Sequence, residues 1–402
     1  MTTAPGVTRG PSCVAFRLTG MPSAHLDPHA DTTPVTTARN LDLDLDVVAL
    51  TAAVCDIESV SGAEDELTDA VQVALAAVPG LEVIRDGNVV IARTHLGRPS
   101  RVVVAGHLDT VPVTRHTPNL PTHREGDRLV GRGTVDMKGG IAVMLRLAAR
   151  VREPRYDVTY VFYDCEEIES ARNGLRRIAL ERPDLIRGDF AVLMEPTAGA
   201  VEGGCKGTLR VEVRTHGVAA HSARPWAGHN AIHDAAEVLA RLAAYTPRVV
   251  TVDGLDYHEA LQAVLVSGGT ATNVIPDRCV VTVNYRYAPD LGEAEAEAHV
   301  RDVFAGFEVV VTDNAGGARP GLDLPAAQEF VAALGVPVRA KEGWTDVARF
   351  AAIGIPAVNF GPGDPLLAHR DDESAPVSDY LACEDAMRRW LALDAAAVTV
   401  SP

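Results

Sequence analysis

Apolar residues recur along this chain of 402 residues with two different periods, and the dominant period changes along its length. In residues 47–57 they fall on one face of a helix, and residues 64–78 repeat this helical spacing. Shorter apolar runs at 82–85, 88–93 and 101–105 have the length and β-branched content of strands. Folded structure is therefore expected to begin near Val47, with two amphipathic helices followed by strands.

In the next hundred residues apolar strands alternate with helices. The predicted elements are a helix at 141–152, a strand at 157–163, a helix at 174–180 and a strand at 190–194. These strands are apolar enough to be buried on both faces, as in sheets that helices cover on both sides. The pattern predicts an α/β domain with a mixed, mostly parallel sheet.

A different pattern follows Cys205. Apolar and polar residues alternate in predicted strands at 208–215, 261–267 and 278–286, and helices are predicted at 230–244 and 292–303. Half-exposed strands with two helices are typical of an α+β domain. We therefore expect an inserted lid and dimerisation domain over residues 207–317.

The first pattern returns near residue 322, with a helix ending near 334, a segment at 343–352 without an assigned type, and a strand at 357–360. These elements are expected to complete the first sheet. Residues 45–206 and 318–402 would then form one catalytic domain around the insertion. Residues 1–44 are rich in Thr, Pro, Ala and Asp and show no period, which is typical of a disordered leader.

Composition and charge exclude several classes of function. Apolar residues make up 47% and charged residues 23%, as in globular proteins. A net charge of −17 opposes binding to nucleic acid or to an anionic membrane, so neither partner is expected. An anionic substrate would need local cations. The six cysteines are scattered without a CxxC pair, and no apolar stretch spans a bilayer, so the cytoplasm is the expected location.

Two apolar strands end in side chains that can bind metals. RVVVAGHLDTVP places His107 and Asp109 two residues apart, on the same side of an extended chain. AVLMEPT ends in Glu195, which the following proline biases to an extended conformation. A strand-end histidine bonded to a nearby aspartate is a common structural feature, so His107 and Asp109 alone leave both interpretations open.

Four further candidates lie in loops. In GRGTVDMKGG, Asp136 precedes a predicted helix, where a helix N-cap is as good an interpretation as a metal ligand. In YVFYDCEEI, one of the adjacent Glu166 and Glu167 can bind a metal while the other takes protons, but two solvated acids would have the same sequence. His369 in FGPGDPLLAHRDDE follows a predicted strand, and a loop histidine carries little weight by itself.

The combination is more specific than its parts. His107, Glu167 and Glu195 follow three successive apolar strands, whose carboxyl ends meet at one edge of a parallel sheet. Two histidines and three carboxylates suit Zn²⁺, with one carboxylate shared between two ions. Such ions lower the pKa of bound water toward ~7 and polarise a carbonyl group. The sequence therefore predicts a metal-dependent hydrolase.

These five motifs, in their order along the chain, resemble the M20 metallopeptidase family over about residues 47–395. The resemblance implies two Zn²⁺ ions per subunit, with Co²⁺ able to substitute. For one ion the implied ligands are His107, Asp136 and Glu195. For the other they are Asp136, Glu167 and His369. The resemblance also implies that Asp136 bridges the ions, that Asp109 orients His107, and that Glu166 is the proton shuttle.

Segments of the inserted domain resemble the lid of this family. GVAAHSARP would bring His221 across a dimer interface to stabilise the oxyanion in the partner subunit's site, the alternative being a surface histidine. Asn273 in GGTATNVIP and Arg286 in NYRY resemble contacts to a substrate carboxylate, and Lys206 would add a second positive charge. The resemblance thus implies a homodimer that binds a small N-acyl amino acid.

Three segments indicate the substrate class. WTDVARF, EEIESARNGLRRI and NFGPGDPLLAH resemble the succinyl-diaminopimelate desuccinylases of the actinobacterial type within the M20 family. They imply hydrolysis of N-succinyl-LL-2,6-diaminopimelate to succinate and LL-2,6-diaminopimelate, a step of lysine biosynthesis, with Thr345 near the substrate. Cys165 departs from the small or acidic residue of many relatives and is expected to be a buried spacer.

Two alternatives remain at this point. Acetylornithine deacetylases and other M20 N-acyl-amino-acid amidohydrolases and carboxypeptidases share the same metal motifs. A protein of the same fold that binds its ligand without turnover is the alternative from another class. The presence of Glu166 together with all five ligands argues against that second alternative.

Overall fold

The computed structural model describes residues 40–113 and 119–392. Most of the predicted leader, residues 1–39, lies outside the described residues. Within its last positions, Leu41 is only 4% exposed and packs into the main hydrophobic cluster, beside the partly buried Leu43 and Leu45. Ordered packing therefore starts ahead of the predicted boundary, because these leucines reach the core without forming a helix. None of the described helices is long and apolar enough to cross a bilayer.

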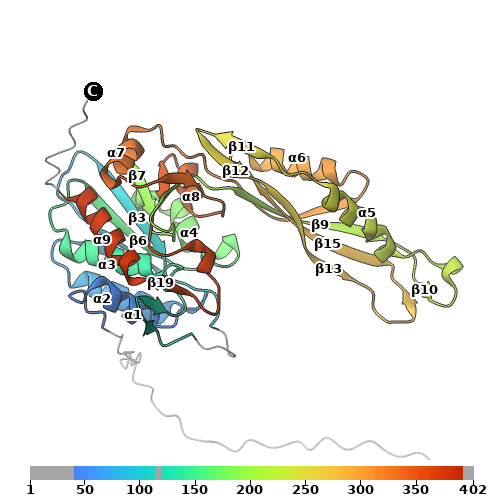
Figure 1. Ribbon diagram of the computed structural model, residues 1–402, viewed down its shortest axis with the longest axis horizontal. Helices are drawn as coiled ribbons and strands as arrows, with labels where there is room; N and C mark the ends of the chain where they lie inside the picture. Colours follow the sequence, from blue (N-terminus) through green and yellow to red (C-terminus); the bar gives the residue numbers. More distant parts are fainter. Residues whose placement is uncertain (1–39, 114–118, 393–402) are drawn as a thin grey trace, which may run out of the picture. The chain divides into compact units, whose positions relative to one another are not determined.

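An eight-stranded sheet holds the candidate ligand motifs, in the order β1-β2-β6-β3-β7-β18-β8-β17. Figure 1 labels three of its central strands, β3, β6 and β7. Its strands are β1 Glu82–Asp86, β2 Val89–Arg93, β3 Arg101–His107, β6 Asp157–Tyr163, β7 Phe190–Leu193, β8 Val201–Gly203, β17 Val338–Ala340 and β18 Ala357–Asn359. The neighbours β6, β3, β7 and β18 run parallel, whereas β1 pairs with β2, β2 with β6, and β8 with β18 in antiparallel fashion. The predicted mixed, mostly parallel sheet is confirmed.

Helices cover both faces of this sheet. One face packs against α1 Val47–Cys55, α2 Asp65–Ala76, α3 Lys138–Arg150, α7 Pro325–Leu334 and α9 Val377–Leu391. The other packs against α4 Gly174–Glu181 and α8 Val347–Ala352. Along β3, Val102 and Val104 join the first cluster while Val103 and Ala105 join the second, as expected from the alternation of side chains along a strand. Burial on both faces explains the continuous apolar runs in the sequence.

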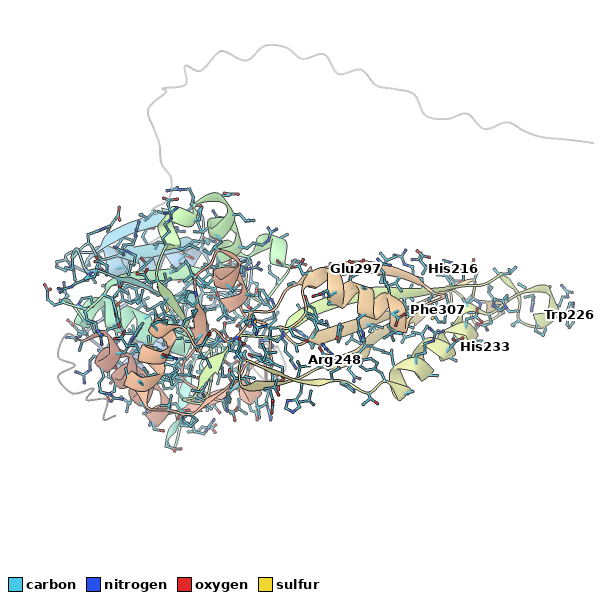
Figure 2. All side chains as sticks on the ribbon, turned by 90° about the horizontal axis from the view of Figure 1, so that it is seen from above. His216, Trp226, His233, Arg248, Glu297 and Phe307 are labelled. Atoms are coloured by element: carbon cyan, nitrogen blue, oxygen red, sulfur yellow. The ribbon has the colours of Figure 1, made fainter. Side chains whose placement is uncertain are left out.

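A four-stranded antiparallel sheet, in the order β13-β15-β9-β16, lies within residues 207–315. It consists of β9 Gly207–His216, β13 Ala260–Gly268, β15 Arg278–Tyr287 and β16 Glu308–Ala315. Helices α5 Ala231–Ala244 and α6 Glu293–Val303 bury their apolar residues on it; His233 and Glu297 mark these helices in Figure 2. We propose that this sheet and its helices are the inserted domain predicted for residues 207–317.

Three smaller β elements complete the described structure. They are a three-stranded sheet of β4 His123–Glu125, β5 Arg128–Val130 and β19 Ser374–Pro376, the hairpin β11 Val249–Val252 with β12 Leu255–His258, and the pair β10 Ala220–His221 with β14 Val274–Ile275. The hairpin contacts the large sheet, since the Tyr257 hydroxyl donates to the carbonyl of Gly203 at 2.8 Å. None of these elements was predicted, because strands of two to four residues leave little periodic signal.

Two larger elements were also missed, and one helix was predicted to start too late. Helix α9 buries residues three or four apart, a helical spacing that the sequence contained, and β16 was missed as well. Helix α3 begins at Lys138 rather than at residue 141. A Cβ atom on Gly140 would lie 2.3 Å from the carbonyl oxygen of Met194, and one on Gly139 would lie 2.5 Å from the Tyr380 ring. These glycines therefore allow close packing inside the helix and do not mark a turn before it.

Candidate metal centre and active site

Three adjacent parallel strands bring three candidate ligands to one edge of the large sheet. His107 is the last residue of β3, Glu167 lies in the loop after β6, and Glu195 follows β7. His369 arrives from the loop after β18, the next strand in the sheet. The topology thus gathers side chains that are up to 262 positions apart (369 − 107) at the carboxyl ends of the strands, where ligands of α/β sheets bind.

Asp136 lies between the two histidines. Its Oδ1 is 3.3 Å from Nε2 of His107, and its Oδ2 is 3.2 Å from Nε2 of His369. Glu195 Oε1 lies 3.9 Å from the same nitrogen of His107. Glu167 Oε1 lies 2.9 Å from Nε2 of His369. The five residues therefore form two groups that share the Asp136 carboxylate.

The Asp136 carboxylate does not cap helix α3. The residue in the cap position is Met137, and no side chain there accepts a backbone hydrogen bond. Instead, the backbone N–H groups of Val135 and Asp136 donate to Glu373 Oε1 at 2.9 and 3.2 Å. Glu373 is fully buried and pairs with Arg132 at 2.6 Å. Glu373 therefore fixes the loop that aims Asp136 at the histidines; it lies in the AHRDDE motif, but sequence reasoning did not assign it a role.

The electrostatics of this cluster fit a cation. Burial raises the pKa of Glu195 to about 7, and the charge of Asp136 adds to the effect. Burial and Asp136 also raise the pKa of Glu167. Glu195 Oε1 is buried and accepts no hydrogen bond from any described residue. Carboxylates that lie close together, and a buried oxygen without a hydrogen bond, destabilise the folded protein unless a positive charge is near. Carboxylate and imidazole groups together are a donor set for borderline divalent metals. The residues present therefore fit the implied ions.

His107 is oriented by Asp109 in two ways. Its Nδ1 lies 3.0 Å from the backbone carbonyl of Asp109 and 3.4 Å from the carboxylate Oδ1 of that residue. A carbonyl only accepts, so Nδ1 carries a proton and Nε2 faces Asp136. Burial lowers the pKa of His107, but hydrogen bonds to Asp109 and Asp136 outweigh it and hold the pKa well above its usual value. A cation at Nε2 would replace that second proton.

Glu166 lies beside this cluster, and within the described residues its carboxylate makes no hydrogen bond to any of the five candidate ligands. Burial raises its pKa well above the usual value for glutamate, and although His107 opposes the shift, Asp346 and Glu195 reinforce it. A partly buried acid with a raised pKa suits general acid and base chemistry. Because Glu166 and Glu167 are both partly buried, the interpretation of two solvated acids does not apply.

Two cavities meet at this edge. One of about 570 Å³ is lined by Asp136, Glu166, Glu167, Glu195 and His369, together with Thr345 and Lys341. The other, of about 800 Å³, is lined by Glu166, Glu167 and His369 and by Thr208, Arg210 and Arg286 of the four-stranded sheet. Thr345 and Arg286, two of the predicted substrate contacts, thus each line one of these cavities. Lys341 and Arg210 were not predicted, and no local motif singled them out.

Three predicted residues lie elsewhere. Lys206 lines neither of these cavities, because its ammonium group pairs with Glu342 at 2.6 Å and donates to the carbonyl of His258 at 2.5 Å. The role of Lys206 as a second charge for the substrate stays a prediction, and in this structure its ammonium group is already paired with Glu342. His221 and Asn273 lie next to each other on or beside β10 and β14, joined by the backbone bond from Ser222 to Asn273 at 2.9 Å. Within the described residues they too line neither cavity.

Comparisons with known proteins found a matching family and named relatives. The profile of Peptidase family M20/M25/M40 matches residues 103–393. The chain is 57% identical over 354 residues to a Mycobacterium tuberculosis protein named putative succinyl-diaminopimelate desuccinylase DapE, covering 87% of this chain and 99% of that protein. It is 44% identical to a succinyl-diaminopimelate desuccinylase of Corynebacterium glutamicum, covering 87% and 97% respectively.

Solved structures share the fold. A tripeptidase from Staphylococcus aureus matches with a TM-score of 0.71 at 20% identity, covering 87% of this chain and 98% of that one. An M20 family metallo-carboxypeptidase from Sulfolobus solfataricus matches with a TM-score of 0.70 at 15% identity, covering 86% and 98%.

Proposed function

The chain belongs to peptidase family M20/M25/M40, a family of metal-dependent hydrolases, and on that premise we propose that it hydrolyses N-succinyl-LL-2,6-diaminopimelate to succinate and LL-2,6-diaminopimelate. The main support for this substrate is the 57% identity to the Mycobacterium tuberculosis relative, over 99% of the length of that protein. Relatives named probable carboxypeptidases reach only 27% and 28% identity, so other M20 substrates are not favoured. The product would serve lysine biosynthesis.

We infer that the site holds two divalent cations, Zn²⁺ or in its place Co²⁺. The ligands proposed for one are His107, Asp136 and Glu195. Those proposed for the other are Asp136, Glu167 and His369. The support is the separation of 3.3 and 3.2 Å between the two oxygens of Asp136 and the two histidines, which gives each group its own oxygen of one carboxylate. When bound, such cations polarise the amide carbonyl and make the attacking water more acidic.

The residues of the chain would then carry the proton transfers. Glu166 accepts a proton from the water whose oxygen attacks the succinyl carbonyl carbon. As the C–N bond breaks, Glu166 delivers that proton to the departing amine, so that succinate and LL-2,6-diaminopimelate leave with no net change at the enzyme. The carboxylate of Asp109 accepts hydrogen bonds from the backbone N–H groups of Glu166 and Glu167 at 3.0 and 3.1 Å. These bonds keep both glutamates in place.

The purified, zinc-loaded protein is expected to cleave N-succinyl-LL-2,6-diaminopimelate but not N-acetylornithine, and a chelator should abolish the cleavage. Release of free amine from each compound, with and without chelator, measures this. Cleavage of N-acetylornithine alone would keep the metal mechanism and overturn the substrate. No cleavage of either compound would contradict the proposed function.

Two arginines are proposed to bind substrate carboxylates. Arg210 on β9 and Arg286 on β15 line the cavity that also contains Glu166. Burial lowers the pKa of Arg286, and the charge of Arg210 lowers it further, so the two guanidinium groups lie close enough to repel. An anion between them would relieve this repulsion, and guanidinium groups match the geometry of a carboxylate. These two arginines would attract an anionic substrate locally, although the net charge of the chain is −17.

Replacing Arg210 or Arg286 by alanine is expected to lower kcat/KM for the succinyl substrate about 10- to 100-fold, since a hydrogen bond to a charged group contributes ~1.5–3 kcal/mol. Most of the effect should fall on KM. Arg214→Ala is the matched control, because Arg214 also lies on β9 but pairs with Glu212 and Glu308. Wild-type kinetics in both cavity variants would contradict the proposed contact.

We propose that the protein forms a homodimer through β13. This strand is at the edge of its sheet, and three consecutive residues are exposed: Val264 by 51%, Leu265 by 68% and Val266 by 55%. An open apolar edge strand is a surface that pairs with another chain. Trp226, 81% exposed, lies close in sequence to His221 in the same inserted segment (Figure 2). A dimer would let this segment of one subunit reach the site of its partner.

If His221 acts in the partner's site, mixing and re-equilibrating the inactive variants Glu166→Ala and His221→Ala should restore about a quarter of wild-type activity, because half of the dimers carry one complete site of two. Light scattering reports the dimer in the same samples. Adding Leu265→Glu to both variants should yield monomers and remove the recovered activity. Failure to recover activity from mixed dimers would contradict the role of His221.

A further inference from the structure

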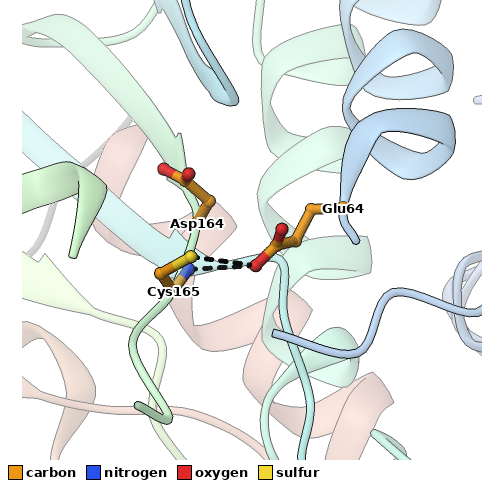
Figure 3. Close-up of side chains that lie close together, drawn as sticks. All are labelled: Glu64, Asp164 and Cys165. Carbon is orange, nitrogen blue, oxygen red and sulfur yellow. Dashed lines mark hydrogen bonds between the residues drawn. The ribbon is translucent and has the colours of Figure 1, made fainter. Parts of the chain in front are cut away.

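The turn that carries the two catalytic-site glutamates is held by carboxylates from other parts of the chain. Three consecutive backbone N–H groups donate to them. The N–H of Cys165 donates to Glu64 Oε1 at 3.2 Å (Figure 3). The next two, of Glu166 and Glu167, donate to Asp109 at 3.0 and 3.1 Å. The orientation of both glutamates therefore depends on acceptors outside their own loop.

This turn needs such support because its backbone is unusual. Cys165 has φ = 57°, in the left-handed region that residues with a side chain avoid. Its thiol also donates to Glu64 Oε1, at 3.4 Å. Cys165 is 4% exposed, as expected for a buried spacer, but its two donors both reach the same carboxylate. Glu64 therefore stabilises the conformation from which the next two residues project.

Glu64 is placed for this contact and not for a helix cap. It directly precedes α2, yet its side chain accepts no backbone hydrogen bond from that helix. The residue is fully buried, and its Oε1 also accepts a hydrogen bond from the N–H of Gly62 at 2.8 Å. In the part of the chain that the structure describes, Oε2 has no hydrogen-bond partner. A buried carboxylate that lacks some of its hydrogen bonds lowers the stability of the folded protein. If packing alone mattered at this position, a residue without acceptor atoms would be expected instead of glutamate.

The same short segment also supports the second carboxylate. Ser61 donates its hydroxyl to Asp109 Oδ2 at 2.7 Å, and Glu64 lies three positions later. Residues 61–64 thus contact the turn directly through Glu64 and indirectly through Asp109. Asp164 lies close to this pair, and the dashed lines in Figure 3 mark the donation of the Cys165 N–H and thiol to Glu64.

We propose that Glu64 is a positioning residue for the hydrolysis: its carboxylate fixes the turn at Cys165 so that Glu166 faces the attacking water while Glu167 keeps its place beside His369. The proposal rests on the proposed function for its kinetic consequence. Within the described residues Glu64 lines neither cavity of the candidate site, and its carboxylate contacts the turn through the N–H and the thiol of Cys165.

The test compares three variants of Glu64 with Asp65→Ala, the matched control at the adjacent exposed first residue of α2. Glu64→Ala should lower kcat about 10- to 100-fold with KM and bound metal unchanged, since small misplacement of a catalytic group has effects of this size. Glu64→Gln keeps an acceptor oxygen and should recover most of the activity. Glu64→Asp, whose carboxylate is one methylene short of the turn, should behave like alanine and provides the test if alanine does not fold.

Hydrogen exchange gives a readout that does not need activity. The amides of residues 165–167 should lose protection in Glu64→Ala and keep it in Glu64→Gln and Asp65→Ala. The proposal is overturned if kcat and this protection stay at wild-type values in Glu64→Ala, or if kcat falls only in proportion to folded or metal-loaded protein. A wild-type protein that cleaves no succinyl substrate would instead contradict the proposed function, and the exchange result would still decide the role of Glu64.

Discussion

Replacing Glu166 by alanine is expected to lower kcat by about 10²- to 10⁴-fold while the metal content and the affinity for substrate stay near wild-type values. The reason is its position: Glu166 lies beside the five proposed ligands and lines both cavities, but its carboxylate contacts none of them by a hydrogen bond in the described structure. Burial keeps its pKa high, which favours an acid that can both take and return a proton. Turnover kinetics and elemental analysis of the same preparation measure the two effects.

Glu181→Ala, which removes an exposed acid from α4, serves as the control for loss of a negative charge. A Glu166→Ala protein that keeps turnover within a few fold of wild type would exclude Glu166 as the proton shuttle. Loss of metal together with turnover would assign it to the ligands instead. If neither the wild type nor the variant turned over any substrate while both bound it equally, the non-catalytic alternative would replace the enzyme.

Replacing Asp136 by alanine should have the broadest effect on the metal centre, because both histidines face oxygens of this one carboxylate at 3.3 and 3.2 Å. We expect both cations to be lost and activity to fall by at least about a thousand-fold, since the cations provide the Lewis acidity of the reaction. His369→Ala is the comparison: it removes a ligand from one group only and should leave one cation bound.

Metal stoichiometry after dialysis against dilute Zn²⁺ separates the two variants. If the Asp136→Ala variant retains two cations, the Asp136 carboxylate does not bridge them in the wild-type protein. Equal loss in both variants would show that the two proposed groups cannot bind independently. Thermal unfolding with and without Zn²⁺ adds a second readout, because a ligand that binds only the folded state raises the transition temperature.

The positions of the charges proposed to bind substrate show how much a local sequence pattern can predict. Arg286 was identified from its motif, and it lines the cavity beside Glu166. Lys206 was assigned the same role, but it pairs with Glu342, a residue 136 positions later in the chain (342 − 206). Arg210 lies in the cavity without any motif to mark it. Charge type alone could not distinguish these three, because a long side chain finds its partner only when distant segments have packed.

The N-cap alternative for Asp136 was settled in the same way. Sequence allowed a cap or a ligand, since the residue precedes a helix in both cases. The folded chain brings Glu373 to the neighbouring backbone N–H groups and His107 and His369 to the carboxylate. Glu64 is a further example, because its contact with Cys165 spans 101 positions and follows from the packing of α2 against the sheet rather than from the residues around it.

The sequence by itself determined the parallel core strands and the candidate ligands at their ends, including His107 and Glu195. These depend on local periodicity and on the fact that parallel strands present their carboxyl ends at one edge. Only the tertiary structure decided which loop residues meet there, which acids support the turn at Cys165, and which cations reach the cavity. Those outcomes depend on contacts between segments far apart in the chain, where burial and the pairing of each polar group are fixed by packing and not by neighbouring residues.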